Sequence, residues 1–338
     1  MSTIAVIGAG AFGTALAIYA RGLGHDVRVW CFEPELPELV RLHGENTLYL
    51  PGYPIDPGIA FCDDMPTVLA GAELVLIICP SSHVRDTSAA LAPHLPAGAL
   101  VASAAKGIEN GTLQLMCEVL AETLPDHVGR LACLSGPSFA KDLAAGLPTN
   151  IACAANDYPV AVAVQELLHS PRLRVYTSDD VTGVELGGAV KNIIAIACGA
   201  SDAMGLGASA RASLMTRGLA EMTRLGVAMG ASPITFLGLA GVGDLVLTCT
   251  GDLSRNRTFG KRLAAGETPE EILSSQRAVA EGYVTAKAVH ALNRKLAVDM
   301  PITDAVYRVC YRGSCFREEA ANLASRDKKD EFQGMQVS

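Results

Sequence analysis

A glycine-rich segment near the N-terminus constrains the fold of this 338-residue chain more than any other feature. Gly8, Gly10 and Gly13 follow the apolar run at residues 3–7 in the spacing GxGxxG, and a helix-like stretch opens at Thr14. In this pattern the first glycine makes a tight turn, the second lets backbone approach a pyrophosphate, and the third permits close packing of helix on strand. The free amides and the dipole at the helix N-terminus favour an anion there. The segment therefore predicts a dinucleotide-binding unit.

An acidic residue lies where such a unit needs one. Glu33 falls 20 residues beyond Gly13, just past the apolar run that ends at Trp30. A carboxylate there can hydrogen-bond the adenosine ribose, which favours NAD. Arg28 or Arg41 could instead turn toward the 2′-phosphate of NADP, so the choice of cofactor stays open. GxGxxG alone could also be a simple turn, but strand, helix and acid in register favour cofactor binding.

The pattern of predicted secondary structure changes near residue 180. Before it, short apolar runs alternate with helix-like segments, which predicts an α/β Rossmann-like domain with a parallel-rich, doubly wound sheet. The predicted strands are residues 3–7, 27–30, 74–79, 99–102, 131–134, 151–154 and 174–176. After it, strand-like alternation nearly disappears, and the predicted helices are 181–203, 208–229, 269–273, 283–295, 303–311 and 317–325. We therefore expect a cofactor domain at 1–180 and an all-α domain at 181–338.

Composition narrows the functional classes. The formal net charge of −8 argues against nucleic acid or an anionic membrane as the main partner. The ten cysteines form no CxxC pair, as is typical of buried thiols in a reducing compartment. No secretory signal and no run of about 18 apolar residues is visible, so we expect a soluble cytoplasmic protein. The seven histidines show no metal-ligand spacing, and neither a GxSxG elbow nor a P-loop occurs, so no metal site or hydrolase is predicted.

Two lysines are candidates for chemistry on a carbonyl group. Lys191 lies in a small, apolar helical segment, and Lys106 follows the predicted strand at 99–102. The pKa of a lysine falls readily on desolvation or beside other cations, which suits proton transfer near neutral pH. Periodicity alone favours a Lys191 that reaches the surface over one held in a pocket. Lys106 could equally be an ordinary loop lysine.

A basic cluster in the helical half can bind an anion. Ser254, Arg255, Asn256 and Arg257 follow the run 241–245, which contains Asp244. Arginine forms forked hydrogen bonds to phosphate, and serine and asparagine can complete the shell. The alternative is a solvated helix start, but local positive charge in an acidic protein favours an anion site.

These residues lie in motifs that resemble the bacterial-type NAD(P)-dependent glycerol-3-phosphate dehydrogenases over roughly residues 4–326. The matching stretches include VIGAGAFGTALA, AAKGIE at 104–109, SGPSFAKDLAAGLPT at 135–149, ELGGAVKNIIAIA at 185–197 and GLAGVGDLVLTCTGDLSRNRTFG at 238–260. GLGASARASLMTRGLAEMTRLG at 205–226, AEGYVTAK at 280–287 and MPITDAVY at 300–307 also match. The resemblance implies an active site between the two domains, hydride transfer between dihydroxyacetone phosphate and sn-glycerol 3-phosphate, and a supply of the latter for phospholipid synthesis.

The resemblance also implies roles for individual residues. Lys191 would exchange the proton, with Lys106 against the substrate and Asp244 orienting the lysine or the glycerol hydroxyls. The remaining substrate contacts would be Gly136, Ser138, Ser254, Arg255 and Asn256. The cofactor contacts would be Gly8, Gly10, Ala11, Phe12, Gly13, Phe32, Glu33, Lys106, Ala140, Arg255, Val279 and Glu281.

The sequence departs from the family at two of these places and leaves competing functions open. Phe32 stands where relatives often carry a polar or basic residue near the ribose, so NAD and NADP both remain candidates, and Asp142 replaces a common glutamate. The competing readings are another lysine-using hydroxyacid dehydrogenase, a non-catalytic NAD(H)-binding sensor and, more weakly, a lipid-binding surface protein. A homodimer formed through the helical domain is a further expectation.

Overall fold

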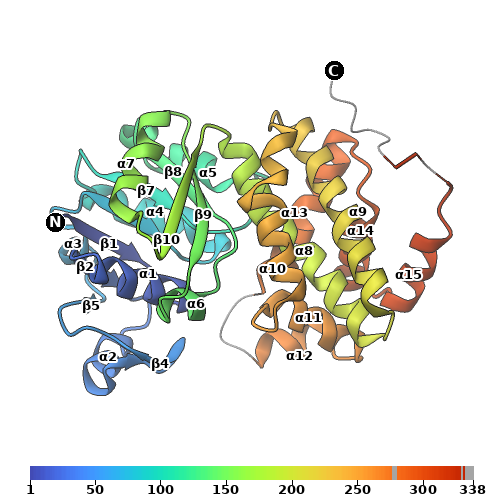
Figure 1. Ribbon diagram of the computed structural model, residues 1–338, viewed down its shortest axis with the longest axis horizontal. Helices are drawn as coiled ribbons and strands as arrows, with labels where there is room; N and C mark the ends of the chain where they lie inside the picture. The colour runs from blue at the N-terminus through green and yellow to red at the C-terminus, as the bar shows by residue number, and fades with distance from the viewer. Residues whose placement is uncertain (276–279, 329, 332–338) are drawn as a thin grey trace. The chain divides into compact units, whose positions relative to one another are not determined.

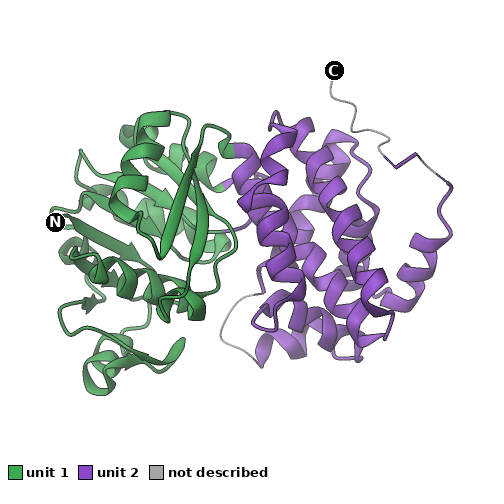
Figure 2. Cartoon of the chain, viewed as in Figure 1, with its two compact units in different colours: residues 1–105, 116–181 green, residues 106–115, 182–338 purple. Residues whose placement is uncertain are grey.

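The computed structural model describes residues 1–275, 280–328 and 330–331, which fall into two compact units (Figure 2). The first unit comprises residues 1–105 and 116–181, and the second comprises residues 106–115 and 182 onward. The N-terminal domain predicted at 1–180 includes residues 106–115. They join the helical unit instead, because Ile108 and Leu115 pair with each other and are buried in its hydrophobic core.

The first unit is built on an eight-stranded sheet whose order is β10-β9-β8-β7-β6-β1-β2-β5 (Figure 1). The strands are β1 (Thr3–Ile7), β2 (Asp26–Trp30), β5 (Ala60–Cys62), β6 (Leu74–Ile77), β7 (Leu100–Ser103), β8 (Leu131–Ser135), β9 (Thr149–Ala154) and β10 (Leu173–Ser178). Within the sheet, the neighbouring strands β5, β2, β1, β6, β7 and β8 pair in parallel, and so do β9 and β10. Only β8 and β9, among these neighbours, are antiparallel. These six parallel strands, which include β1 and β2, therefore place their carboxyl ends at one edge of the sheet.

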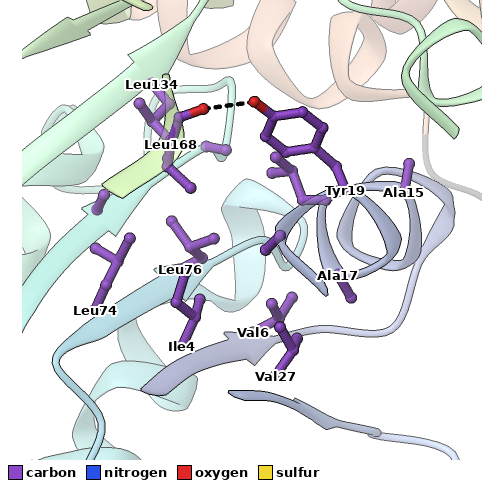
Figure 3. Packing of buried hydrophobic residues seen from close by; sticks show 14 of the residues in the cluster. Ile4, Val6, Ala15, Ala17, Tyr19, Val27, Leu74, Leu76, Leu134 and Leu168 are labelled. Atoms are coloured by element: carbon purple, nitrogen blue, oxygen red, sulfur yellow. Dashed lines mark hydrogen bonds between the residues drawn. The ribbon is translucent and has the colours of Figure 1, made fainter. Parts of the chain in front are cut away.

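The side chains of the central strands alternate between two buried faces. Ile4 and Val6 of β1 face a core shared with α1 (Ala11–Gly22) and α7 (Tyr158–Leu168), as Figure 3 shows in part. Ala5 and Ile7 face a second core, formed with α3 (Met65–Leu69), α4 (Val84–Leu91) and α5 (Met116–Thr123). Burial on both faces explains why the strands read as continuous apolar runs.

A hydrogen bond ties together two helices on the first of these faces. The hydroxyl of Tyr19 in α1 donates to the backbone carbonyl of Leu168 at the end of α7, with an O···O distance of 2.7 Å (Figure 3). The same hydroxyl lies 2.8 Å from Ser170 Oγ. The buried phenol thus has a partner for its polar end while its ring packs in the core, and α1, which carries the glycine-rich turn at its start, is anchored at its far end.

Three small strands of this unit, and several helices that include α2 and α6, were not predicted as such. β3 (Glu45–Asn46) and β4 (Leu50–Pro54) form an antiparallel pair after α2 (Leu36–His43), β5 closes the sheet edge, and α6 (Ala140–Ala144) follows β8. Pro51, Gly52 and Pro54 interrupt any strand-like pattern in β4, which is why the sequence gives little signal there.

The second unit is helical and is organised around α8 (Val181–Ala203), most of whose side chains are buried. Around it are α9 (Gly207–Ala228), α10 (Asp244–Thr250), α11 (Arg255–Ala264), α12 (Pro269–Ser274), α13 (Glu281–Leu296), α14 (Pro301–Arg312) and α15 (Phe316–Ala324) (Figure 1). The prediction of a Rossmann-like, parallel-rich sheet followed by a helical domain is confirmed.

Within the described residues, α8 alone is long and apolar enough by length and composition to span a bilayer. Most of its surface is buried inside the protein, as in the core helix of a globular unit. Its burial, together with the polar residues Glu185, Lys191 and Asn192 that it carries, marks it as an internal helix.

Candidate functional site

The glycine-rich turn has the shape that a pyrophosphate requires. Gly8 follows β1 with φ +118°, and a Cβ on it would lie 2.7 Å from the Ile78 carbonyl oxygen. A Cβ on Gly13 would lie 1.9 Å from the carbonyl oxygen of Gly8, so both positions admit only glycine. A Cβ on Gly10, in contrast, would meet no atom within 4 Å. The space in front of Gly10 is thus open to a ligand.

The first turn of α1 supplies donors to this open space. Ala11 and Phe12 begin the helix and are half-buried, and the first amides of a helix have no carbonyl partner within it. Together with the helix dipole, these amides suit a diphosphate. The glycine-rich turn and the start of α1 therefore fit the dinucleotide that the sequence predicts.

The two residues predicted near the adenosine ribose follow β2 at the same sheet edge. Phe32 is 78% exposed, and its ring lies edge-on to that of Trp30, with 6.3 Å between the centroids. Glu33 is half-buried, and its Oε1 accepts a short hydrogen bond from the hydroxyl of Tyr49. The structure thus holds the acidic residue in place beyond β2.

The turn after β8 brings three more predicted residues to the carboxyl edge of the sheet. Gly136 is buried with φ +142°, and a Cβ on it would lie 2.9 Å from Ile151 Cα. Ser138 Oγ donates to the carbonyl oxygen of Gly136 at 3.1 Å, and Ala140 begins α6. Backbone packing against β9 explains the glycine, while Ser138 and Ala140 remain half-buried.

In the helical unit, one aspartate joins the two candidate lysines. Asp244 is 1% exposed; its Oδ2 lies 2.6 Å from Lys106 Nζ, and its Oδ1 accepts a short hydrogen bond from Lys191 Nζ. Lys191 is 6% exposed, so it is buried rather than at the surface, contrary to what periodicity alone favours. The reason is that a carboxylate from another helix accompanies the buried ammonium.

The elements that meet here explain the geometry. Lys191 projects from α8, Asp244 is the first residue of α10, where the helix dipole favours a negative charge, and Lys106 begins the segment 106–115. A Cβ on Gly187, one turn before Lys191, would lie 2.4 Å from the carbonyl oxygen of Ala240. The missing side chain thus lets the chain that leads into α10 approach α8 closely.

Burial and charge act on these ionisable groups in opposite directions. Burial lowers the pKa of Lys191 to about 7, and the positive charge of Lys106 adds to this effect while Asp244 opposes it. Burial alone would raise the pKa of Asp244, but the two lysines outweigh it and hold that pKa below its usual value. The arrangement therefore combines a fixed carboxylate with an amine that can gain or lose a proton near neutral pH.

A threonine that the sequence analysis missed completes this cluster. Thr248 is buried one turn after Asp244 on α10, and its Oγ1 accepts a hydrogen bond from Lys191 Nζ at 2.9 Å. Its own hydroxyl donates to Asp244 Oδ1 at 3.3 Å. The spacing of four residues along a helix was the available signal, because residues i and i+4 share a face.

The predicted anion-binding residues gather at the start of α11. Ser254 caps the helix by accepting a hydrogen bond from the backbone amide of Arg257, and Arg255 is exposed. Asn256 is buried; its Nδ2 donates to Asn192 Oδ1 at 2.9 Å, and its Oδ1 accepts from the amide of Gly282 at 2.9 Å. Asn256 thus links α11 to α8 and α13, and Asn192, the residue after Lys191, was not singled out by the sequence analysis.

The remaining predicted cofactor residues divide between described and undescribed parts of the chain. Glu281 begins α13, beside the Gly282 amide that Asn256 holds. Partial desolvation of the Arg255 guanidinium lowers the pKa of this exposed residue, and the nearby Glu281 carboxylate opposes the shift. Arg257 is paired with Asp202 and Asp252. Val279 lies outside the described residues.

Comparison with known proteins agrees with this arrangement. Residues 3–161 match the family model for the N-terminus of NAD-dependent glycerol-3-phosphate dehydrogenase, and residues 180–320 match the model for its C-terminus. The glycerol-3-phosphate dehydrogenase (NAD(P)+) of Geobacter sp. strain M21 is 50% identical over 97% of this chain and 98% of its own, and that of Syntrophobacter fumaroxidans is 47% identical over 98% and 97%. The crystal structure of glycerol-3-phosphate dehydrogenase from Coxiella burnetii superposes with a TM-score of 0.91 at 40% identity, covering 96% of this chain and 99% of that one. This chain therefore belongs to the NAD-dependent glycerol-3-phosphate dehydrogenase family.

Proposed function

We propose that this chain is an NAD(P)-dependent sn-glycerol-3-phosphate dehydrogenase that interconverts dihydroxyacetone phosphate and sn-glycerol 3-phosphate. The observation that carries the proposal is the buried cluster of Lys191, Asp244 and Lys106, in which Lys191 has a pKa of about 7. Reduction of a ketone needs a proton donor and positive charge at the developing alkoxide, and this cluster provides both.

The residues of the cluster have separable tasks. In reduction, the Lys191 ammonium gives its proton to the oxygen on C2; in oxidation, the neutral amine takes the proton back. Lys106 adds a second positive charge, so the cluster is net positive as long as Lys191 is in its ammonium form. Asp244 and Thr248 fix the direction of the Lys191 amine. When bound, the nicotinamide cofactor supplies or accepts the hydride at C2.

The phosphate of the substrate is assigned to the start of α11. Arg255 offers a forked guanidinium, and Ser254 and Asn256 lie on either side of it in the sequence. Because Asn256 is already tied to Asn192 and Gly282, we assign it the positioning of α11 beside α8 in addition to any contact with substrate. This anion site favours a phosphorylated substrate over the hydroxyacid of the competing dehydrogenase reading.

The cofactor is assigned to the first unit and to residues that follow it. The glycine-rich turn with Ala11 and Phe12 would hold the pyrophosphate, and Phe32 and Glu33 the adenosine end. Lys106, Ala140, Arg255, Val279 and Glu281 are proposed as further cofactor contacts, and Gly136, Ser138 and Lys106 as further substrate contacts. These assignments rest on the motifs, with the backbone geometry of the two turns in support.

The cellular setting is part of the same proposal. A supply of sn-glycerol 3-phosphate for phospholipid synthesis, a cytoplasmic location and a homodimer are the expectations that accompany this function. Light scattering of the purified protein would test the homodimer.

The reaction itself is tested by mixing purified protein with dihydroxyacetone phosphate and either NADH or NADPH while nicotinamide absorbance is followed. Oxidation of a reduced cofactor that depends on dihydroxyacetone phosphate supports the proposal. Folded protein that binds a dinucleotide but oxidises neither cofactor would favour the sensor reading, whereas activity on hydroxyacids alone would favour the competing dehydrogenase.

The pH dependence of turnover should reverse with the direction of reaction. As pH rises through about 7, the ammonium form of Lys191 is lost. Turnover in ketone reduction should therefore be level below that pH and fall by about tenfold per pH unit above it, while turnover in alcohol oxidation should rise over the same range and then level off. Profiles in both directions that stay flat to about pH 9 would show that Lys191 does not titrate as stated.

Lys191→Ala should lower turnover by about 10³-fold because it removes the proton donor and a positive charge from the reacting centre. The dissociation constant for the reduced cofactor, measured by fluorescence, should be nearly unchanged. The matched control is Lys295→Ala, which removes an exposed lysine in α13 and should leave turnover unchanged. Near-normal turnover in Lys191→Ala would remove Lys191 from the mechanism.

Arg255→Ala should raise the KM for dihydroxyacetone phosphate by about 10- to 100-fold because a charge-assisted pair with the phosphate is lost. Any turnover of unphosphorylated dihydroxyacetone should be the same in Arg255→Ala as in the unmodified protein, since that compound lacks the phosphate that Arg255 would pair with. Arg262→Ala on the same helix is the control, because Arg262 is paired with Glu267. A change confined to the KM of the cofactor would overturn the phosphate assignment.

A further inference from the structure

Residues 46–49, between α2 and β4, connect the two ends of the dinucleotide site. None of these four residues lies in a motif that predicted a functional site. The inference drawn from them rests on the proposed function only in that it takes the first unit to bind a nicotinamide dinucleotide.

The connection starts at the glycine-rich turn. Asn46 is fully buried, and its Nδ2 donates to the carbonyl oxygen of Ala9 and to Thr14 Oγ1, both at 2.8 Å. The amide oxygen of Asn46 accepts the backbone N–H of Tyr49 at 3.0 Å. One side chain thus fixes the turn that faces the pyrophosphate and the backbone of Tyr49 together.

The connection ends at the acidic residue beyond β2. The Tyr49 hydroxyl donates to Glu33 Oε1, which leaves Glu33 Oε2 able to accept from a ribose. Because Tyr49 is itself fixed by Asn46, the carboxylate is oriented before any ligand arrives, and less conformational entropy is lost on binding.

Arg28 and Arg41, the two basic residues considered for a 2′-phosphate, form hydrogen bonds within the protein instead. Arg28 donates to the carbonyl oxygens of Ala70 at 2.7 Å and Thr67 at 3.2 Å, and to Asp26 Oδ2 at 2.9 Å. Arg41 donates two hydrogen bonds to Glu38 on its own helix, at 2.8 and 2.5 Å.

We propose that Tyr49 is a specificity-determining residue, which holds the Glu33 carboxylate at the adenosine ribose so that the site takes NAD(H) in preference to NADP(H). The preference has two physical sources. Glu33 accepts a hydrogen bond from the 2′-hydroxyl of NAD(H), and it repels the dianionic 2′-phosphate that replaces that hydroxyl in NADP(H). Phe32, beside Glu33, contributes no positive charge to offset that repulsion.

The test is a set of binding titrations with NADH and NADPH, followed by nicotinamide fluorescence in the absence of substrate. The unmodified protein should bind NADH about 100-fold more tightly than NADPH, and Glu33→Gln should reduce that ratio to about tenfold or less. Tyr49→Phe should weaken NADH about 3- to 10-fold while leaving NADPH nearly unchanged, because it releases the carboxylate without removing its charge. In the Glu33→Gln background, Tyr49→Phe should have no further effect on the ratio.

The control is Tyr53→Phe, which makes the same chemical change in β4 at a tyrosine whose hydroxyl has no hydrogen bond among the residues described. Equal affinity for the two dinucleotides, or tighter binding of NADPH, would overturn the proposed preference. Equal weakening of both dinucleotides by Tyr49→Phe would reduce Tyr49 to a structural support. Since no substrate is present, these outcomes are independent of whether the protein reduces dihydroxyacetone phosphate.

Discussion

The carboxylate of Asp244 holds the ammonium groups of Lys106 and Lys191 together inside the helical unit, and the chemistry assigned to this protein depends on that contact. A lysine taken out of water without a partner would be strongly destabilising, or would lose its proton permanently. With one carboxylate shared between two lysines, Lys191 keeps a pKa near neutrality. The rest of the unit can be understood as the framework for this contact: α8 presents Lys191, α10 presents Asp244 and Thr248, and Gly187 allows the chain before α10 to approach.

The first unit applies a comparable principle to a different ligand. Its backbone, rather than its charged side chains, shapes the turn that is proposed to hold the pyrophosphate, because Gly8 and Gly13 occupy positions where a Cβ would collide with carbonyl oxygens. Side chains stabilise this backbone and one another through hydrogen bonds: Asn46 supports the turn, and Tyr49 orients Glu33. The proposed cofactor binding and the proposed proton transfer thus rest on separate hydrogen-bond networks, each contained within one unit.

Short-range patterns in the sequence correctly predicted the longer apolar elements and the glycine-rich turn. β1 and α8 have the bounds that their apolar runs predicted, and the glycine-rich turn lies where its spacing places it. The strands β3 and β5 are too short for a periodic signal, and α10 follows a glycine-rich run that hides its start. The antiparallel β8–β9 pair is a property of topology, which alternation of strands and helices does not determine.

The same limit applies to the site. Motifs identified Lys191, Lys106 and Asp244 as candidates, but periodicity favoured an exposed Lys191, since its partner is 53 residues away in the sequence. Thr248, Asn192 and Tyr49 matter through side-chain contacts that only the folded chain reveals. Residues whose role is to orient others carry little signal of their own in a single sequence.

A measurement of the pKa of Lys191 shows whether burial and Asp244 together set its affinity for the proton. Protein labelled with ¹³C at lysine Cε can be titrated by NMR, with the Lys191 resonance assigned from its loss in Lys191→Arg. We expect a midpoint at about 7, and a lower one in Asp244→Asn, because that change removes the negative charge that favours the ammonium form. A Lys191 resonance that titrates near the usual lysine value of about 10.4 would show that the cluster does not lower the pKa of Lys191.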